Sequence, residues 1–259
     1  MNFSYILCAT TALFCLPAMA AEPSKSALDD IIARGTLKIG TTGDYKPFTF
    51  LDTTTGNYEG FDIDLARDLG AALGVKVEFV QTKWGDLMKD FGDAKFDVAM
   101  GGISVTLDRQ KKAFFSTPYL REGKAAIAGC KSVEKFQTLA AIDANGVKVI
   151  VNPGGTNEKF DRANLKAAEI VMNKDNLSIF DELAAGKADV MITDASETLF
   201  QQKQHPGVLC AIHPEKPFDF AEKAYLLPRD PALKDFVDQW LHIERENGAF
   251  NAIFAKWLK

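Results

Sequence analysis

Two similar stretches of sequence decide the fold: DLMKDFGDAKFDV at residues 86–98 and DELAAGKADV at residues 181–190. Each stretch predicts a helix that turns at small residues into a buried strand. The likeness is structural repetition and not a shared catalytic motif. It indicates that two units of the same design lie in one chain of 259 residues.

The segments around each stretch extend the same pattern. Around the first, the sequence predicts helices over residues 26–33 and 84–91 and strands over 36–40, 75–79 and 96–100. It also predicts a helix that follows Gly60 and Phe61 and carries Leu65, Leu69 and Leu73 at helical spacing. Around the second, it predicts helices over 157–168 and 179–185 and strands over 147–151, 169–172 and 188–193. Strands that alternate with helices favour parallel sheets covered by helices, so the expected fold class is α/β.

No low-complexity linker separates the two units. The chain is therefore expected to cross between them on extended segments near residues 118–129 and 220–227, which would make the first unit discontinuous. The first lobe is expected to comprise residues 21–120 together with 223–259. The second lobe is expected to comprise residues 121–222.

The N-terminus, residues 1–20, predicts a secretory signal peptide. It has no charged side chain, and its apolar run leads to the small-residue pattern Ala18-Met19-Ala20. A membrane anchor or a buried strand is the alternative, but the run is well short of the ~20 residues that span a bilayer. We expect a periplasmic protein, cleaved near Ala20, with no membrane insertion.

Four cysteines bear on the redox state of the protein. Cys8 and Cys15 fall in the predicted signal peptide, so the mature chain keeps Cys130 and Cys210. An oxidising compartment favours a disulfide between these two, and two free buried thiols are the alternative. We expect neither cysteine to act as a nucleophile.

Composition excludes several classes of partner and site. A formal net charge of −5 and a pI near 5.3 argue against a nucleic-acid partner, which normally requires a basic face. The three histidines are far apart and show no metal-ligand or triad spacing with the cysteines. We therefore expect no metal, no cofactor and no covalent nucleophile.

Two loops that follow strands are candidate anion sites. GGTN at residues 154–157 opens a helix, whose free N–H groups and dipole suit a carboxylate or phosphate, with an ordinary capped turn as the alternative. SVTLDR at residues 104–109 supplies two hydroxyls and a guanidinium that can bind a carboxylate. Here a surface arginine that pairs with Asp108 is the alternative.

A third loop, TDASE at residues 193–197, ends a predicted strand with two carboxylates three residues apart. Two acids in one cleft can acquire different pKa values and different roles. A capping box formed by Asp194 and Glu197 is the alternative. Tyr45 and Trp84 would add flat apolar surface to such a cleft, although each alone is more typical of a core.

These loops resemble those of the periplasmic amino-acid-binding proteins of transporters, across essentially the whole mature chain. The resemblance implies the two-lobed periplasmic-binding-protein fold, type II, with a cleft between the lobes. Arg109, in a Ser-x-Thr-x-x-Arg context, matches the arginine that binds the ligand α-carboxylate. Thr156 matches the residue that binds the ligand together with this arginine, from the other lobe. Asp194 matches the acid that meets the α-amino group.

Within that family the chain is most similar to a group of enzymes, the cyclohexadienyl dehydratases. The similarity rests on three long runs: TTGDYKPF at residues 41–48, NPGGTNEKF at 152–160 and PFDFAEKAY at 217–225. It implies that the chain converts prephenate to phenylpyruvate and arogenate to phenylalanine without metal or cofactor. The matching position makes Glu197 the expected catalytic acid.

The expected site draws on both lobes. Besides Glu197, the expected substrate-binding residues are Tyr45, Trp84, Ser104, Thr106, Arg109, Gly155, Thr156, Asn157 and Asp194. The alternative function is an amino-acid-binding protein of an ABC transporter without catalysis, and Glu197 counts against it. The expected partner is the small-molecule substrate, the enzyme group implies self-association, and the preference between prephenate and arogenate stays open.

Overall fold

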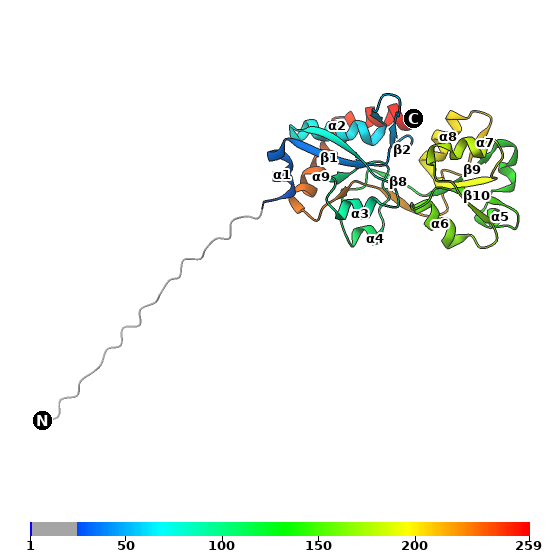
Figure 1. Cartoon of the computed structure of the whole chain (residues 1–259), viewed down its shortest axis with the longest axis horizontal. Helices are drawn as coiled ribbons and strands as arrows, with labels where there is room; N and C mark the ends of the chain where they lie inside the picture. The colour runs from blue at the N-terminus through cyan, green and yellow to red at the C-terminus, as the bar shows by residue number, and fades with distance from the viewer. Residues whose placement is uncertain (2–24) are drawn as a thin grey trace.

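Two five-stranded sheets, one in each of two α/β lobes, form the framework of the protein (Figure 1). The computed structural model describes Met1 and residues 25–259. The predicted signal peptide, with Cys8, Cys15 and the cleavage site near Ala20, lies outside the described residues apart from Met1.

The first sheet has the strand order β5-β1-β6-β15-β7. Its strands are β1 (Thr36–Thr41), β5 (Lys76–Gln81), β6 (Val98–Ala99), β7 (Phe114–Phe115) and β15 (Leu226–Leu227). β1 pairs in parallel with β5 and β6, whereas β15 lies antiparallel between β6 and β7. Alternate residues of β1, Leu37 and Ile39, are fully buried, which is the pattern of a strand packed against a core.

The second sheet repeats this arrangement with the order β11-β10-β12-β9-β13. Its strands are β9 (Lys124–Gly129), β10 (Lys148–Val151), β11 (Glu169–Met172), β12 (Val190–Asp194) and β13 (Leu209–Ile212). β10 is parallel to β11 and β12, and β9 is antiparallel to β12 and β13. In each sheet the fourth strand follows a crossing from the other lobe. The two lobes therefore share one topology, which confirms the predicted repetition.

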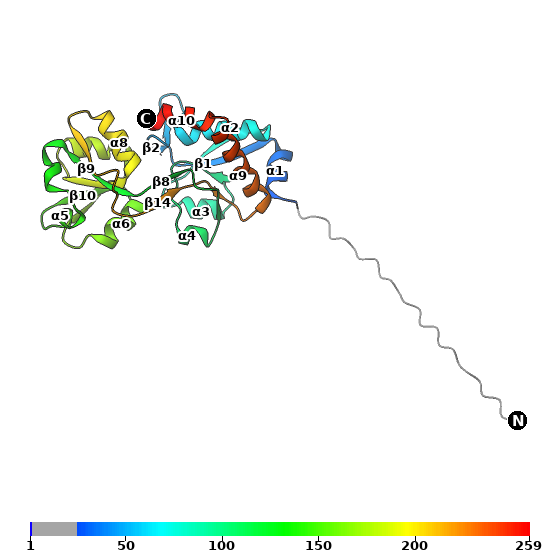
Figure 2. The same ribbon diagram turned by 180° about the vertical axis from the view of Figure 1, so that it is seen from behind.

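Two short strands, β8 (Leu120–Glu122) and β14 (Ala221–Lys223), pair antiparallel and lie between the lobes (Figure 2). They fall within the segments where the sequence predicts the chain to cross. A narrow two-stranded connection is the kind of segment about which two lobes close on a ligand.

Helices flank both sheets. The first lobe has α1 (Ala27–Arg34), α2 (Phe61–Leu73), α3 (Leu87–Gly92), α4 (Leu107–Gln110), α9 (Pro231–Glu246) and α10 (Ala249–Leu258), and a small sheet of β2 (Asp44–Tyr45), β3 (Thr49–Leu51) and β4 (Tyr58–Glu59). The second has α5 (Leu139–Ile142), α6 (Thr156–Asn164), α7 (Ile179–Ala184), α8 (Ala195–Gln204) and the 3₁₀ helices η1 (Cys130–Lys135) and η2 (Asn176–Ser178). Among the described residues, no helix is both long and apolar enough to cross a membrane.

The longest helix of the early chain, α2, shows how the sequence sets an element. Leu65, Leu69 and Leu73 recur every fourth residue and are buried on one face. Gly74 then adopts the left-handed conformation, with φ of 69°, and its N–H donates to the carbonyl oxygen of Ala71. The predicted helix that carries these leucines is therefore confirmed, although it already begins at Phe61, which the sequence analysis places before it.

The predicted helix over residues 157–168 is too long at its C-terminal end. α6 ends at Asn164, and Leu165 is extended and buried. The carboxylate of Asp143 accepts hydrogen bonds from the backbone N–H groups of residues 166, 167 and 168. Since these N–H groups are held by a side chain from another segment, they cannot continue the helix.

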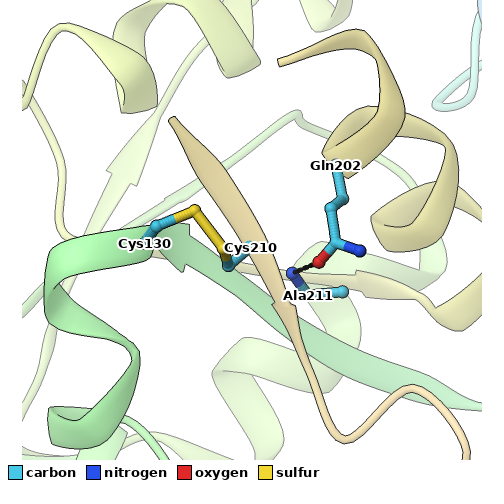
Figure 3. Close-up of a disulfide and its surroundings, with 4 residues drawn as sticks. All are labelled: Cys130, Gln202, Cys210 and Ala211. Carbon is cyan, nitrogen blue, oxygen red and sulfur yellow. Dashed lines mark hydrogen bonds between the residues drawn. A yellow bond between two sulfur atoms is a disulfide. The ribbon is translucent and has the colours of Figure 1, made fainter. Parts of the chain in front are cut away.

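A disulfide joins Cys130, at the start of η1, to Cys210 of β13 (Figure 3). It spans a sequence separation of 80 residues within the second lobe. Beside it, the N–H of Ala211 donates to the side-chain oxygen of Gln202 at 2.9 Å, which ties β13 to α8. The disulfide and this hydrogen bond therefore hold β13, the edge strand of the second sheet, in place.

Removing this disulfide tests its contribution to stability. We expect the double variant Cys130→Ser/Cys210→Ser to lose about 2–4 kcal/mol of unfolding free energy, because a long loop of the unfolded chain is no longer closed. Urea unfolding of the oxidised wild type and of the variant measures the difference. Wild type reduced with dithiothreitol is the control and should match the variant, whereas equal midpoints for all three samples would contradict the prediction.

Candidate active site

Loops from both lobes meet in one cleft, at the carboxyl ends of parallel strands, where α/β sheets bind ligands. β1 leads to Tyr45, β10 leads to Gly155, and β12 ends on Asp194. Backbones touch across this cleft at Gly85 and Gly154. A Cβ atom on Gly154, whose φ is +87°, would lie 2.6 Å from the Cα atom of Gly85, so the close approach requires glycine.

Asp194 stands at the centre of the cleft, and its side chain is only 4% exposed. Its Oδ1 accepts a hydrogen bond from the Nζ of Lys124 at 2.6 Å, and its Oδ2 accepts from Lys223 and from the hydroxyl of Tyr45. Burial alone would raise the pKa of this carboxyl, but the two ammonium groups lower the pKa well below its ordinary value. Asp194 is therefore a carboxylate with both oxygens engaged.

The two lysines that hold Asp194 were missed in the sequence analysis. Lys124, the first residue of β9, also donates to the Oγ1 of Thr156 at 3.0 Å and to the Oδ1 of Asn157. Lys223, the last residue of β14, is 1% exposed and donates to the Oγ of Ser104 at 3.0 Å. For Lys124 the available signal was a lone cation at the start of an apolar strand, because lysine is almost never buried without a partner.

Glu197 lies in the first turn of α8 and is 2% exposed. Its Oε2 accepts a hydrogen bond from Thr193, whose hydroxyl oxygen in turn accepts one from the amide of Asn157 at 2.9 Å. Burial raises the pKa of Glu197 to about 8, with the charge of Asp194 adding to the effect and the Thr193 hydrogen bond and the two lysines opposing it. At neutral pH this carboxyl keeps its proton.

Arg109 and Thr106 make contacts within the loop that follows Ser104, a residue of the cleft. A guanidinium nitrogen of Arg109 donates to the carbonyl oxygen of Ser104 at 2.7 Å. Burial lowers the pKa of Arg109 to about 10, against the opposing charge of Asp194, so the group stays charged at neutral pH. Thr106 caps α4 by accepting from the N–H of Arg109 at 3.2 Å.

A third buried carboxyl, Glu122 of β8, was also missed in the sequence analysis. Its Oε2 accepts from the N–H of Ser196 at 2.9 Å, and its Oε1 lies 3.5 Å from the Nζ of Lys223. Burial raises the pKa of Glu122, while Lys223 opposes the shift and Asp194 adds to it. Glu122 therefore ties a crossing strand to the helix that carries Glu197.

The space left between these groups is small. A cavity of about 20 Å³ remains, and it is lined by Tyr45, Trp84, Gly102, Ser104, Asn152, Gly155, Thr156, Asn157, Asn176, Asp194 and Lys223. The amide of Asn176 donates across the cleft to the carbonyl oxygen of Asp44 at 2.9 Å, and the indole N–H of Trp84 donates to the Asp44 carboxyl at 3.1 Å. The lobes are thus closed, and a ligand that contains a ring can enter only when they separate.

Most of the predicted site residues meet in this lining: Tyr45, Trp84, Ser104, Gly155, Thr156, Asn157 and Asp194. Thr106, Arg109 and Glu197 do not line it. Glu197 lines an adjoining cavity, which shares Asn176 with the cleft.

The capping alternative for Asp194 and the surface alternative for Arg109 are wrong. Asp194 occupies the N-cap position of α8 without a side-chain capping bond. Arg109 is buried, and Asp108 pairs with Lys111 at 3.2 Å instead. The polar side chains of the loops therefore contact one another across the cleft.

This arrangement can hold an anion and supply a proton. Three buried cations, Lys124, Lys223 and Arg109, lie around Asp194, whose pKa is lowered, while burial raises the pKa values of Glu122 and Glu197. The N-terminus of α6 adds partial positive charge to these cations. Among the described residues, no group of three or more His, Cys, Asp or Glu side chains is placed to hold a metal ion.

Comparison with known proteins agrees with the fold. The model of the bacterial extracellular solute-binding proteins, family 3, matches residues 37–259. A cyclohexadienyl dehydratase of Pseudomonas aeruginosa is 51% identical over 258 residues, which cover 100% of this chain and 96% of the relative. An L-cystine-binding protein of Escherichia coli is 27% identical over 232 residues, which cover 89% of this chain and 85% of the relative.

Two solved structures of ancestral proteins are also similar. An ancestral amino-acid-binding protein, described as a precursor of cyclohexadienyl dehydratase, has a TM-score of 0.83 and 35% identity, covering 90% of this chain and 100% of its own. An ancestral cyclohexadienyl dehydratase has a TM-score of 0.58 and 49% identity, covering 92% and 98%. By these matches in sequence and fold, the chain belongs to the bacterial extracellular solute-binding proteins, family 3.

Proposed function

We propose that the chain is a cyclohexadienyl dehydratase, which converts prephenate to phenylpyruvate and arogenate to phenylalanine. The observation that carries the proposal is the buried carboxyl of Glu197. Burial raises the pKa of this carboxyl to about 8, and the carboxyl lies beside a cluster of buried cations. The carboxyl supplies a proton, and the cations suit an anionic substrate. The 51% identical relative of Pseudomonas aeruginosa supports the same activity.

In this proposal the cationic end of the cleft binds the carboxylates of the substrate. Lys124 and Lys223, which both bind Asp194, are the ammonium groups at this end. Arg109, which donates to the carbonyl oxygen of Ser104, adds its charge. Backbone N–H groups at the start of α6, from Gly155 to Asn157, add donors to the same end. The ring of the substrate packs against Tyr45 and Trp84, whose own rings lie edge to face with centroids 5.6 Å apart.

The chemistry then needs one proton. Glu197 protonates the ring hydroxyl while the bond from carbon to that oxygen breaks, and water leaves. The bond between the ring and its carboxylate breaks as well, CO₂ departs, and the electron pair of that bond completes the aromatic ring. Glu197 is left as a carboxylate, and the reaction requires no electron donor or acceptor.

Closure of the lobes prepares the acid for this step. Burial is the main cause of the raised pKa of Glu197, so an open cleft would let the group ionise. Closure over the substrate therefore keeps the proton on the acid and excludes water from the leaving group.

The choice of substrate depends on Asp194. In a binding protein of the family this acid would meet the α-amino group of the ligand, but here Lys124 and Lys223 already occupy its two oxygens. The ammonium of arogenate has to compete with these lysines, whereas the keto group of prephenate does not.

Export and assembly belong to the same proposal. We propose that residues 1–20 are a signal peptide cleaved near Ala20. The first lobe then comprises residues 21–120 together with 223–259, and the second comprises residues 121–222. The mature periplasmic protein self-associates. The extracellular family supports export, as does the disulfide, since such bonds persist in oxidising compartments.

A second candidate function is that of an amino-acid-binding protein serving a transporter, which family membership favours. It would leave Glu197 without a role. Incubating the purified wild type with prephenate, and separately with arogenate, distinguishes the two functions. Formation of phenylpyruvate or phenylalanine supports the dehydratase, whereas tight binding of an amino acid without turnover of either compound supports the transport protein.

Replacing the acid tests its role. Glu197→Gln preserves size and can keep a hydrogen bond to Thr193, but it cannot donate an acid proton. We expect kcat with prephenate to fall by about 10²–10⁴-fold, the usual contribution of a general acid. Glu134→Gln, at an exposed position on η1, is the matched control and should retain wild-type kcat. Full turnover by Glu197→Gln would show that another group is the acid.

The pH dependence of the reaction tests the protonation state. Because only the protonated form of Glu197 donates, kcat for prephenate, which reports the closed complex, should be level below the pKa of about 8 and fall as the pH rises through it. The residual kcat of Glu197→Gln should lack this fall. If the wild-type kcat instead rose with pH across the same range, Glu197 would not be acting as an acid.

A further inference from the structure

A second cavity, of about 260 Å³, adjoins the cleft and reaches Glu197. Asp44, Lys46 and Phe50 line it from the first lobe, and α7 and α8 line it from the second. It is separate from the central cleft, although Asn176 lines both. The reaction chemistry described above assigns no role to this cavity.

Polar side chains on one face of α8 run along the wall of the cavity. Glu197, Gln201 and His205 are spaced four residues apart, so they lie above one another on the helix, and all three line the cavity. Glu197 and Gln201 are 2% and 8% exposed, whereas His205, just past the end of the helix, is half-buried. The row therefore leads from the buried acid towards the surface.

The proposed reaction gives such a path a use, because the path can return a proton to Glu197 while the lobes are still closed. Each turnover removes one proton from Glu197, because a substrate with two carboxylates becomes a product with one, together with CO₂ and water. Glu197 is almost fully buried, and the closed cleft has room for about 20 Å³ only. The second cavity is polar and large enough to hold several water molecules, which can carry a proton.

We propose that this second cavity is the route by which Glu197 regains its proton, with His205 exchanging protons with solvent at its outer end. The inference rests on the proposed dehydratase function. In each cycle a proton passes from solvent to His205, then through water beside Gln201, and finally to the carboxylate of Glu197.

The charges around the route are compatible with this role. Asp44, Lys46 and Asp181 line the same cavity, and Lys46 lies over the ring of Phe50, 3.9 Å from its centroid. On its other side Glu197 meets the charges of Asp194 and the two lysines, and Tyr45 lies close by. Among the groups that line the cavity, His205 is the imidazole, whose two ring nitrogens can accept and donate a proton.

Kinetics of His205→Gln test the route. A single turnover with enzyme in excess should run at the wild-type rate, because Glu197 starts protonated. Steady-state turnover at low buffer concentration should fall by about 10²-fold, the lower end of the usual range of general acid–base effects, and imidazole buffer at constant ionic strength should restore it. Product should therefore appear as a burst of one equivalent followed by a slow phase. His242→Gln, at an exposed position on α9, is the matched control and should show no burst.

The outcomes separate this inference from the proposed function. Wild type that turns over neither prephenate nor arogenate would overturn the proposed function itself. Active wild type, with a His205→Gln variant whose steady-state rate equals that of wild type in every buffer, would overturn the route alone. A variant slowed equally in the single turnover and in the steady state would also overturn it, because that result indicates a structural role.

Discussion

The bridge from Lys124 and Lys223 to Asp194 is the interaction on which the rest of the site depends. It joins β9, β12 and β14, and the hydroxyl of Tyr45 brings the first lobe to the same carboxylate. Removing one partner of a buried ion pair leaves an uncompensated charge, at a cost of about 3–5 kcal/mol. The three groups therefore act as a unit that closes the lobes, keeps Asp194 ionised and sets two cations in the cleft.

The solute-binding fold already provides what this chemistry requires. Its two lobes close over a ligand and exclude water, and in a binding protein that closure serves affinity alone. Here the same burial raises the pKa of Glu197, while the neighbouring lysines hold the pKa of Asp194 low. Two carboxyls three residues apart thus acquire opposite protonation states from their surroundings. In the proposed function, the protonated Glu197 in this closed cleft is the group that donates the proton.

The sequence predicts the fold well because local patterns determine it. The repeated stretches at residues 86–98 and 181–190 become matching helix–strand units, and most predicted elements lie within a few residues of the observed ones. The failures are long-range. Lys124, Lys223 and Glu122 belong to strands that crossings bring together, and no local spacing relates them to Asp194. Likewise α6 ends early because the distant Asp143 captures the backbone N–H groups that follow it.

The protonation state of Glu197 in the closed protein tests the central claim most directly. Carbon-13 NMR of protein labelled at the glutamate carboxyl carbons, recorded over a range of pH and compared with Glu197→Gln, identifies the signal of this group. We predict a carboxyl that titrates near pH 8 in the wild type and is missing from the variant. A Glu197 signal that titrates near the ordinary value of 4.5 would contradict the claim that the closed cleft keeps the acid protonated.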